Sequence, residues 1–560
     1  MQVPGPYALN HRDDSAANLT RSAIVVGVPL LALLGLILFG KPLFETNDDC
    51  GLAMIGAGFG TAVEPEPHLI FSHFGYGLLL NAVSRFAGPN AHGWTTLAAL
   101  GGSIGLYAHA ISGYWREDPV LVGAALVIGL GCVFTRALLD PQFTLTASLL
   151  FGAATGCRLA ALREGAQSPG LAAGIYGALI LSFLMRPAIA ILGPIVVGPA
   201  LIWLAWRGPE SSRRQTLRFL IALVAIAAAI YLTDKAAYFF SPEWRDAVEY
   251  NQLRSLFNDF YRIPWIPNSP EYAKVGWSAN DHAMFMSWYS LHPIFDYANV
   301  KYLADTLLLQ TPLFAFSGAR AWLTSLWQSP LLSAAVAAQV LTCILLPRHR
   351  TFLVLVAIGT LAALILSGLT GRPPVFRVQF SAISIALLCT LPLLSGAAPQ
   401  SNLIRGIGVY LLAGIALYVG SVTMRAHHKQ VLEAAAYRAE LSEVSRYFAG
   451  TVISWGATLA WEWLITPTKV YPPLAGTTIP SIGLFTKMPV MTSALRRLGI
   501  NDLGLTLCTQ PDVRLIAAAS NVATLKNFCQ EHYHVRPTYS LVFSHPRTEI
   551  YLSGQPERWQ

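Results

Sequence analysis

Long apolar runs separated by short polar turns fill the first three-quarters of the chain. The first run extends from Ser22 to Phe39, and similar runs recur as far as residue 424. A helix needs about 20 mainly apolar residues to cross the hydrocarbon core of a bilayer. The pattern therefore predicts an α-helical polytopic membrane protein with about eleven transmembrane helices, at 22–39, 94–114, 120–139, 142–159, 170–185, 188–206, 217–233, 331–346, 351–368, 377–395 and 404–424.

Residues 69–86 are nearly as apolar as these runs, but they contain Ser72, His73 and Asn81 and end near Arg85. If this segment lies flat on the membrane, the basic residues of the loops all fall on one side. The positive-inside rule assigns that side to the cytoplasm. We therefore expect an interfacial helix at 69–86. The basic loop residues are Arg12, Arg21, Arg116, Arg158, Arg163, Arg207, Arg213, Arg214, Arg348, Arg350 and Arg405.

This topology predicts a multi-pass protein of the bacterial inner membrane with a cytoplasmic N-terminus. The first outer loop, 40–93, the long segment 234–330 and the tail after Arg425 are then extracytoplasmic. We divide the chain into a transmembrane domain, 1–424, and a soluble periplasmic domain, 425–560. Segment 306–328 contains apolar stretches, and the sequence leaves open whether it re-enters the membrane.

The tail has the pattern of a small α+β domain. A charged helical stretch at 426–448 comes first, and a short helix is expected at 491–498. Alternating apolar and polar residues at 513–517 and 539–543 predict strands. Cys508 and Cys529 share this tail, so a disulfide between them is an open alternative if the tail is extracytoplasmic.

Composition agrees with a lipid-covered surface. Hydrophobic residues make up 54% of the 560 residues and charged residues only 12%, whereas soluble domains carry roughly 25% charged residues. The net charge of +8 does not indicate nucleic-acid binding, because the Lys and Arg residues stand singly between apolar runs. The sequence also lacks a Walker A motif, a dinucleotide fingerprint and a His-Glu-x-x-His zinc motif.

Three acidic residues are candidates for catalysis on the outer side. Asp48 and Asp49 follow the first span, and Asp140 stands between two spans in the sequence Arg136–Pro141. Carboxylates at a membrane surface are costly to desolvate unless they bind a cation or a proton. A solvated loop start at Asp48 and Asp49, and a polar helix end at Asp140, are the alternative interpretations.

A second group of candidates lies in the long outer segment, at Trp277, Asn280, Asp281 and His282. Aromatic rings stack on apolar sugar faces, and acids and amides bind hydroxyl groups. The alternative is an interfacial belt of tryptophans, which is common in membrane proteins.

Arginines on the predicted outer side form a third group. Arg186, Arg372 and Arg377 run against the positive-inside rule. Guanidinium groups match phosphate oxygens well, so a lipid phosphate is the natural partner. Simple binding of phospholipid headgroups is the alternative.

The order of these features resembles the GT-C superfamily of glycosyltransferases that use polyprenyl-phosphate sugars. Lipid A aminoarabinose transferases and protein mannosyltransferases belong to it. The resemblance rests on the acidic pair Asp48 and Asp49 after the first span and on the Pro-bearing stretch 64–69 before a flat helix. Two spans then lead to the Arg-Ala-Leu-Leu-Asp-Pro turn with Asp140.

The resemblance implies transfer of a sugar from a polyprenyl-phosphate donor to an envelope glycan, lipid or protein on the outer face. It implies catalytic roles for Asp48, Asp49 and Asp140, and it leaves open a divalent metal ion at Asp48 and Asp49. We expect substrate binding by His68, His73, Arg186, Trp277, Asn280, Asp281, His282, Arg372 and Arg377. The alternatives are a lipid or glycan transporter or flippase, and a non-catalytic membrane scaffold.

Overall fold

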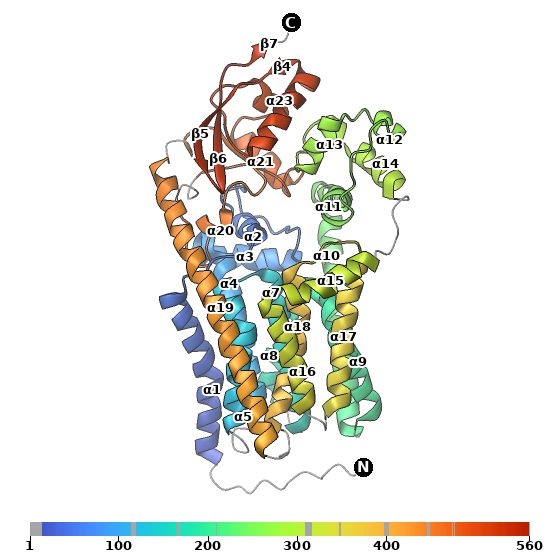
Figure 1. The fold of residues 1–560 in the computed structure, drawn as a ribbon, viewed down its shortest axis with the longest axis vertical. Coiled ribbons are helices and arrows are strands. Elements are labelled where there is room, and N and C mark those ends of the chain that lie inside the picture. Colours follow the sequence, from blue (N-terminus) through green and yellow to red (C-terminus); the bar gives the residue numbers. More distant parts are fainter. Residues whose placement is uncertain are drawn as a thin grey trace.

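The computed structural model describes residues 14–113, 119–164, 168–208, 210–308, 316–345, 349–396, 402–444, 448–472, 474 and 477–558. Long helices form a bundle, and a smaller part with a β-sheet lies beyond one end of it (Figure 1). The prediction of a helical membrane protein with a small C-terminal α+β domain is confirmed. Among the basic residues used for the topology, Arg12, Arg116 and Arg348 lie outside the described residues.

Seven helices among the described residues are long and apolar enough to cross a membrane, and the number eleven stays a prediction. The bundle comprises α1 (Asp14–Gly35), α4 (Ala91–Ser112), α5 (Pro119–Gly129) with α6 (Thr135–Leu139), α7 (Phe143–Glu164), α8 (Pro169–Met185), α9 (Ile189–Arg207), α10 (Glu210–Phe239), α16 (Pro330–Leu345), α17 (Arg350–Leu369), α18 (Phe376–Thr390) and α19 (Asn402–Glu443).

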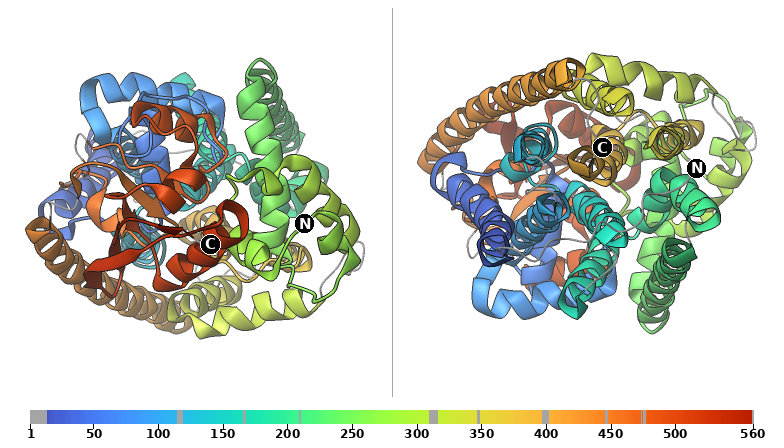
Figure 2. Two further views of the ribbon diagram at one scale, coloured as in Figure 1. Left: turned by 90° about the horizontal axis from the view of Figure 1, so that it is seen from above. Right: turned by 90° about the horizontal axis from the view of Figure 1, so that it is seen from below.

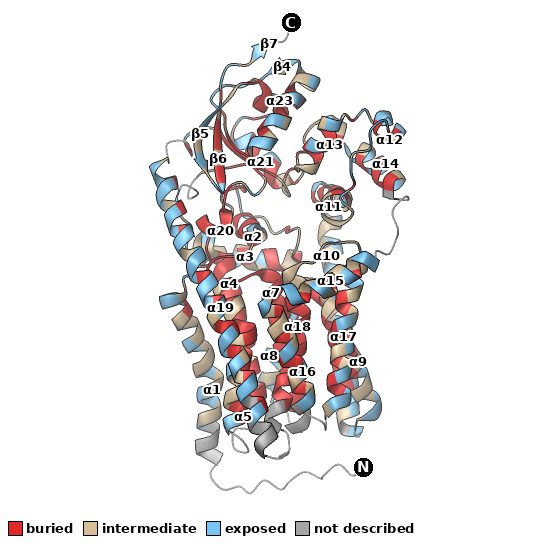
Figure 3. Cartoon of the chain, viewed as in Figure 1, coloured by how far each residue is buried: buried red, intermediate tan, exposed pale blue. Residues whose placement is uncertain are grey.

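Burial within the bundle follows the position of each helix. The central helix α7 is buried along nearly its whole apolar length, whereas peripheral helices such as α1 are largely exposed or half-buried (Figure 3). Their exposed apolar side chains include Leu31 and Phe39. An outer surface this apolar suits lipid tails and not water.

Two short helices lie at the end of the bundle that faces the sheet (Figure 1). They are α2 (Asn47–Ala57) and α3 (Phe74–Ala87). At 1.5 Å per residue, the 14 residues of α3 extend about 21 Å, which is short of a hydrocarbon core about 30 Å thick. The helix predicted at 69–86 begins later than expected, at Phe74. His73 caps it there by accepting a hydrogen bond from the Gly75 amide at 2.8 Å.

A sharp bend separates α15 (Phe316–Gln328) from α16. The two helices meet at 92°, and Pro330, which has no amide hydrogen to continue a helix, is the first residue of α16. Helix α15 lies across the end of the bundle beside α17 (Figure 1). Part of the segment 306–328, residues 309–315, lies outside the described residues.

The C-terminal part is connected to the bundle by one continuous helix, since α19 runs past residue 424 to Glu443. Its sheet has the strand order β2-β1-β3-β6-β5, with parallel pairing of β1 to β2 and β3 and antiparallel pairing elsewhere. The elements are β1 (Val452–Trp455), α20 (Trp461–Leu464), β2 (Ser481–Ile482), α21 (Pro489–Arg497), α22 (Leu503–Thr509), β3 (Arg514–Ile516), α23 (Ala519–Tyr533), β5 (Tyr539–His545) and β6 (Thr548–Ser553), with β4 (Val535–Arg536) and β7 (Glu557–Arg558) as a separate pair.

The long outer segment packs against this C-terminal part. Its helices are α11 (Pro242–Ser255), α12 (Pro270–Lys274), α13 (Ala279–Met286) and α14 (Tyr297–Leu308). They share one hydrophobic core with β1, α22 and α23, and the Trp455 indole donates a 2.6 Å hydrogen bond to the Ser287 carbonyl. A disulfide joins Cys508 on α22 to Cys529 on α23. Seen along the bundle, these parts cover its end (Figure 2).

Candidate functional site

Asp48 lies in the first turn of α2 and forms an ion pair with Arg377. The carboxylate and guanidinium are 3.0 Å apart, and Arg377 lies in the first turn of α18. The Asp48 side chain is 19% exposed, so a substrate group can reach it. Burial raises the pKa of Asp48, against the opposing effect of Arg377.

Two further arginines surround this pair. Arg186 follows the last residue of α8, and Arg372 lies between α17 and α18. Burial and repulsion by Arg377 lower the pKa of Arg186 to about 10, and the same two causes lower the pKa of Arg372. All three arginines interact electrostatically with Asp48, and this local excess of positive charge makes the place suited to an additional anion.

The Arg186 guanidinium is held in place by several contacts, but one of its hydrogen-bond donors has no partner among the described residues. Its Nη1 donates to the Phe71 carbonyl at 2.9 Å, and the guanidinium lies over the rings of Phe71 and Phe143. The buried Nε has no hydrogen-bond partner among the described residues. Buried polar groups normally have partners, so this donor is available to a ligand.

Asp49 points away from this cluster and is fully buried. It accepts hydrogen bonds from the Phe143 amide at 2.8 Å, the Thr46 hydroxyl at 2.8 Å and His92 at 3.3 Å. Because successive helical residues project about 100° apart, Asp48 and Asp49 do not converge on one point. Asp49 thus fastens α2 to the start of α7.

Asp140 belongs to a second buried network. His427 on α19 contacts Asp140 at 2.8 Å through Nδ1 and the Gly40 carbonyl at 2.8 Å through Nε2. Arg136 forms an ion pair with Asp140 and another, at 3.1 Å, with Glu45. Arg136 also lies 5.8 Å from the centre of the Phe376 ring, so this network adjoins the Asp48–Arg377 pair.

The two histidines predicted to bind substrate occupy different surroundings. His68 is paired with Glu66 at 2.6 Å and is stacked on Trp244, and its buried Nε2 has no hydrogen-bond partner among the described residues. His73 is engaged at both ring nitrogens, by the Gly75 amide and by the Ile230 carbonyl at 2.8 Å. Only His68 therefore keeps a free polar atom.

A cavity of about 600 Å³ lies beside Arg186, between the segment before α3 and helices α10 and α11. Its lining is amphipathic and includes Leu69, Ile70, Phe71, Ser72, Arg186, Asp234, Lys235, Tyr238, Phe239, Arg245, Val248 and Glu249. This mixture of apolar surface with basic and acidic groups suits a polar lipid headgroup with its first chain atoms.

The predicted sugar-binding group at 277–282 is not part of this site. The Trp277 indole is 4% exposed and donates to the Ile294 carbonyl at 2.9 Å. Asn280 donates to the Thr524 carbonyl at 3.2 Å, and His282 contacts the Ile263 carbonyl at 2.9 Å. Asp281 contacts His532 at 2.7 Å. In this structure these side chains fasten the outer segment internally and to the C-terminal part.

Two further cations, Arg254 and Lys487, were not among the residues predicted from the sequence. Arg254 is stacked on Trp288, with its guanidinium carbon 3.7 Å from the ring centre, and lies 3.7 Å from Asp259. Asp259 also interacts electrostatically with Arg372. Lys487, in the C-terminal part, lies over the Tyr250 ring. No local motif distinguishes these residues, because only the packing of distant segments brings them together.

No protein-family model and no curated protein matches the chain. Among solved structures, ArnT from Cupriavidus metallidurans in the apo state is 11% identical, with a TM-score of 0.47 and coverage of 96% of this chain and 98% of that chain. The same enzyme bound to undecaprenyl phosphate gives 9% identity and a TM-score of 0.45, again over 96% and 98% of the two chains.

The archaeal oligosaccharyltransferase AglB from Archaeoglobus fulgidus, in complex with an inhibitory peptide and a dolichol-phosphate, is 13% identical. Its TM-score is 0.41, with coverage of 96% of this chain and 74% of that chain.

Proposed function

We propose that this protein is a glycosyltransferase that moves a sugar from a polyprenyl-phosphate donor to an acceptor on the extracytoplasmic face of the inner membrane. The observation that carries the proposal is the partly exposed carboxylate of Asp48 within a cluster of Arg186, Arg372 and Arg377. The cluster lies at the end of the bundle, where a lipid-linked donor would place its phosphate.

Asp48 is the general base of this mechanism. The acceptor hydroxyl or amine attacks the anomeric carbon, and a bond from that carbon to the acceptor forms as the bond to the phosphate oxygen breaks. The acceptor proton passes to Asp48, and the polyprenyl phosphate leaves with the bonding electron pair. A positioned base typically contributes about 10²–10⁴-fold to such a step.

The arginines stabilise the negative charge that develops on the leaving phosphate. Arg186 has a buried, unpartnered Nε, and the pKa values of Arg186 and Arg372 are lowered, first by burial and then by repulsion from Arg377. An incoming phosphate relieves this repulsion. Donors that are in place before the charge develops need no reorganisation during the reaction.

The donor phosphate would enter through the amphipathic cavity beside Arg186. Its lining holds Lys235 and Arg245 beside the acidic Asp234 and Glu249, and Phe71 and Phe239 supply apolar surface. The polyprenyl chain would then continue into the membrane along the exposed apolar side chains of α10, such as Tyr231 and Leu232.

Three features support an extracytoplasmic site. The disulfide between Cys508 and Cys529 favours an oxidising compartment. The same end of the bundle carries the C-terminal part and the Asp48 cluster (Figure 1). Basic residues of the opposite end, such as Arg207 at the end of α9 and Arg214 near the start of α10, follow the positive-inside rule. We therefore propose a cytoplasmic N-terminus and a periplasmic C-terminal domain.

Undecaprenyl phosphate binding tests the proposal directly. Native mass spectrometry of the detergent-purified protein should show one bound undecaprenyl phosphate, retained against excess phosphatidylglycerol. The double variant Arg186→Gln/Arg372→Gln should lose it, whereas Arg214→Gln, an exposed residue at the other end of α10, should keep it.

Transfer is then measured in proteoliposomes with polyprenyl-phosphate sugars and envelope extracts as acceptors. Asp48→Asn should abolish sugar transfer while leaving undecaprenyl phosphate bound. Equal retention of undecaprenyl phosphate and phosphatidylglycerol by the wild type, or full transfer by a folded Asp48→Asn protein, would refute the proposal.

A further inference from the structure

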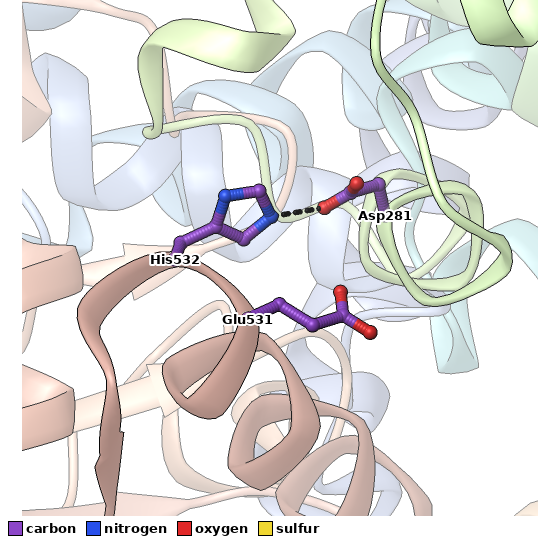
Figure 4. Close-up of side chains that lie close together, drawn as sticks. All are labelled: Asp281, Glu531 and His532. Carbon is purple, nitrogen blue, oxygen red and sulfur yellow. Dashed lines mark hydrogen bonds and ion pairs between the residues drawn. The ribbon is translucent and has the colours of Figure 1, made fainter. Parts of the chain in front are cut away.

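A cluster of metal-ligating side chains lies far from the Asp48 site, between the outer segment and the C-terminal part. Asp281 belongs to α13, and Glu531 and His532 belong to the last turn of α23. One ligand atom from each of the three lies within 4.8 Å of the others. Figure 4 shows Asp281 and His532 directed toward one another with Glu531 beside them.

We propose that Asp281, Glu531 and His532 bind a zinc ion that clamps the C-terminal domain to the outer segment. The imidazole selects a transition metal over Mg²⁺ and Ca²⁺, which prefer oxygen ligands alone. Tetrahedral zinc holds its ligands at about 2.1 Å, and hence about 3.4 Å from one another. The present contact of 2.7 Å between Asp281 and His532 widens slightly to admit the ion, and the Glu531 carboxylate, already within 4.8 Å of both partners, shifts toward it.

Hydrogen bonds behind the ligands orient two of them. The Ser278 amide donates to Asp281 Oδ2 at 2.8 Å, which leaves Oδ1 facing His532. The Ser278 hydroxyl donates to Glu531 Oε2 at 3.0 Å. Such contacts fix the orientation of metal ligands and raise metal affinity.

The surroundings favour a cation at this point. Asp281 is only 1% exposed, and Glu531 brings a second carboxylate close to it, so the two negative charges repel in a partly desolvated place. A divalent ion removes this repulsion. His292 lies near His532, with ring centres 4.7 Å apart, but its Nδ1 accepts from the Ile294 amide. The Nε2 of His292 therefore carries the proton and cannot bind the zinc ion. Water would supply the fourth ligand.

The clamp would act on the interface between the outer segment and the C-terminal part, and the C-terminal part also contacts α2, which carries Asp48. Helices α13 and α23 share the hydrophobic core that contains Trp455 and Phe528. Phe485, from the C-terminal part, reaches α2 so closely that a Cβ at Gly51 would lie 2.5 Å from its ring.

Zinc content and zinc-dependent stability test this inference with the full chain in detergent. After stripping with EDTA and reloading with ZnCl₂, the wild type should retain one zinc per chain, measured by inductively coupled plasma mass spectrometry. The variants Glu531→Gln and His532→Asn should bind zinc about tenfold or more weakly, and Ser278→Ala about tenfold more weakly. His534→Asn is the matched control, because His534 is exposed and asparagine tolerates its positive φ.

Hydrogen exchange separates a zinc clamp from a simple His–Asp hydrogen bond. EDTA should accelerate exchange in α13 and α23 of the wild type, and it should have much less effect on Glu531→Gln, which lacks one zinc ligand and whose side chain is exposed. A wild type that keeps no zinc, or whose exchange is unchanged by EDTA, would show the hydrogen bond alone and overturn the inference. Either result leaves undecaprenyl phosphate binding at Arg186 and Arg372 to be judged separately.

Discussion

The carboxylate of Asp48 lies 3.0 Å from the guanidinium of Arg377, although the two residues are separated by most of the transmembrane bundle in sequence. This pair closes the contact between the first turns of α2 and α18. It also distinguishes Asp48 from Asp49, whose carboxylate is completely buried among hydrogen-bond donors.

Exchanging each acid for its amide should separate chemistry from stability. Asp48→Asn should abolish transfer yet leave the protein folded. Asp49→Asn should lower the free energy of unfolding by about 1–3 kcal/mol, because an amide presents a donor where Asp49 now accepts from Phe143 or His92. Thermal unfolding in detergent and a transfer assay, run side by side, check both expectations. Equal loss of stability in the two variants would contradict them.

Asp48 should also make the folded protein less stable at neutral pH. Its pKa is raised by burial, so the ionised Asp48 carboxylate lowers the free energy of unfolding. This destabilisation is absent below the unfolded pKa and grows as the pH rises through the folded pKa. Asp48→Asn should therefore raise the melting temperature at pH 7, and the difference should vanish near pH 4. A lower melting temperature for Asp48→Asn than for the wild type at pH 7 would show that ionised Asp48 stabilises the fold, contrary to this prediction.

The acid limb of kcat/KM should report the ionisation of Asp48. Transfer needs the carboxylate, so activity should rise with pH at values above about 4, the ordinary aspartate pKa. Arg377 opposes the raised pKa of Asp48, so Arg377→Gln should move this limb to higher pH. Arg377→Lys, which keeps the charge, is the control and should move it less.

His427 should contribute stability that depends on pH. Both of its ring nitrogens face acceptors, Asp140 and the Gly40 carbonyl, so the geometry favours the protonated ring, which can donate to both. Burial opposes this, but the hydrogen bond to Asp140 raises the pKa of His427 overall. The stability is fully present below the unfolded pKa and is lost as the pH rises through the folded pKa.

The difference in melting temperature between wild type and His427→Gln should accordingly be largest near pH 6 and shrink toward pH 9. His428→Gln, at the neighbouring position on α19, serves as the control, and it should show no such trend. A constant difference across this range would mean that His427 acts through packing alone.

Reducing the disulfide between Cys508 and Cys529 should loosen the C-terminal domain. The bond closes a loop with a sequence separation of 21 residues, which corresponds to about 3 kcal/mol in the chain-entropy model. The variant Cys508→Ser/Cys529→Ser should melt at a lower temperature than the wild type, and added reductant should affect only the wild type. Cys343→Ser is the control, since Cys343 is a free cysteine.

Sequence alone determined the parts of this protein that depend on local pattern. Apolar runs of sufficient length predicted helices such as α7 and α17, and alternation at 513–517 and 539–543 predicted β3 and β5. Composition excluded a soluble surface. The arginines Arg186, Arg372 and Arg377 also stood out, because the predicted topology puts them on the side where the positive-inside rule expects few.

Only the tertiary structure decided which candidates meet. It separated Asp48 from Asp49, and it placed Trp277 in a hydrophobic core. It also showed that α19 continues to Glu443, beyond the boundary at residue 424. Hydropathy is a property of neighbouring residues, whereas the environment of a side chain depends on helix phase and on segments hundreds of residues away, which come together only in the folded chain.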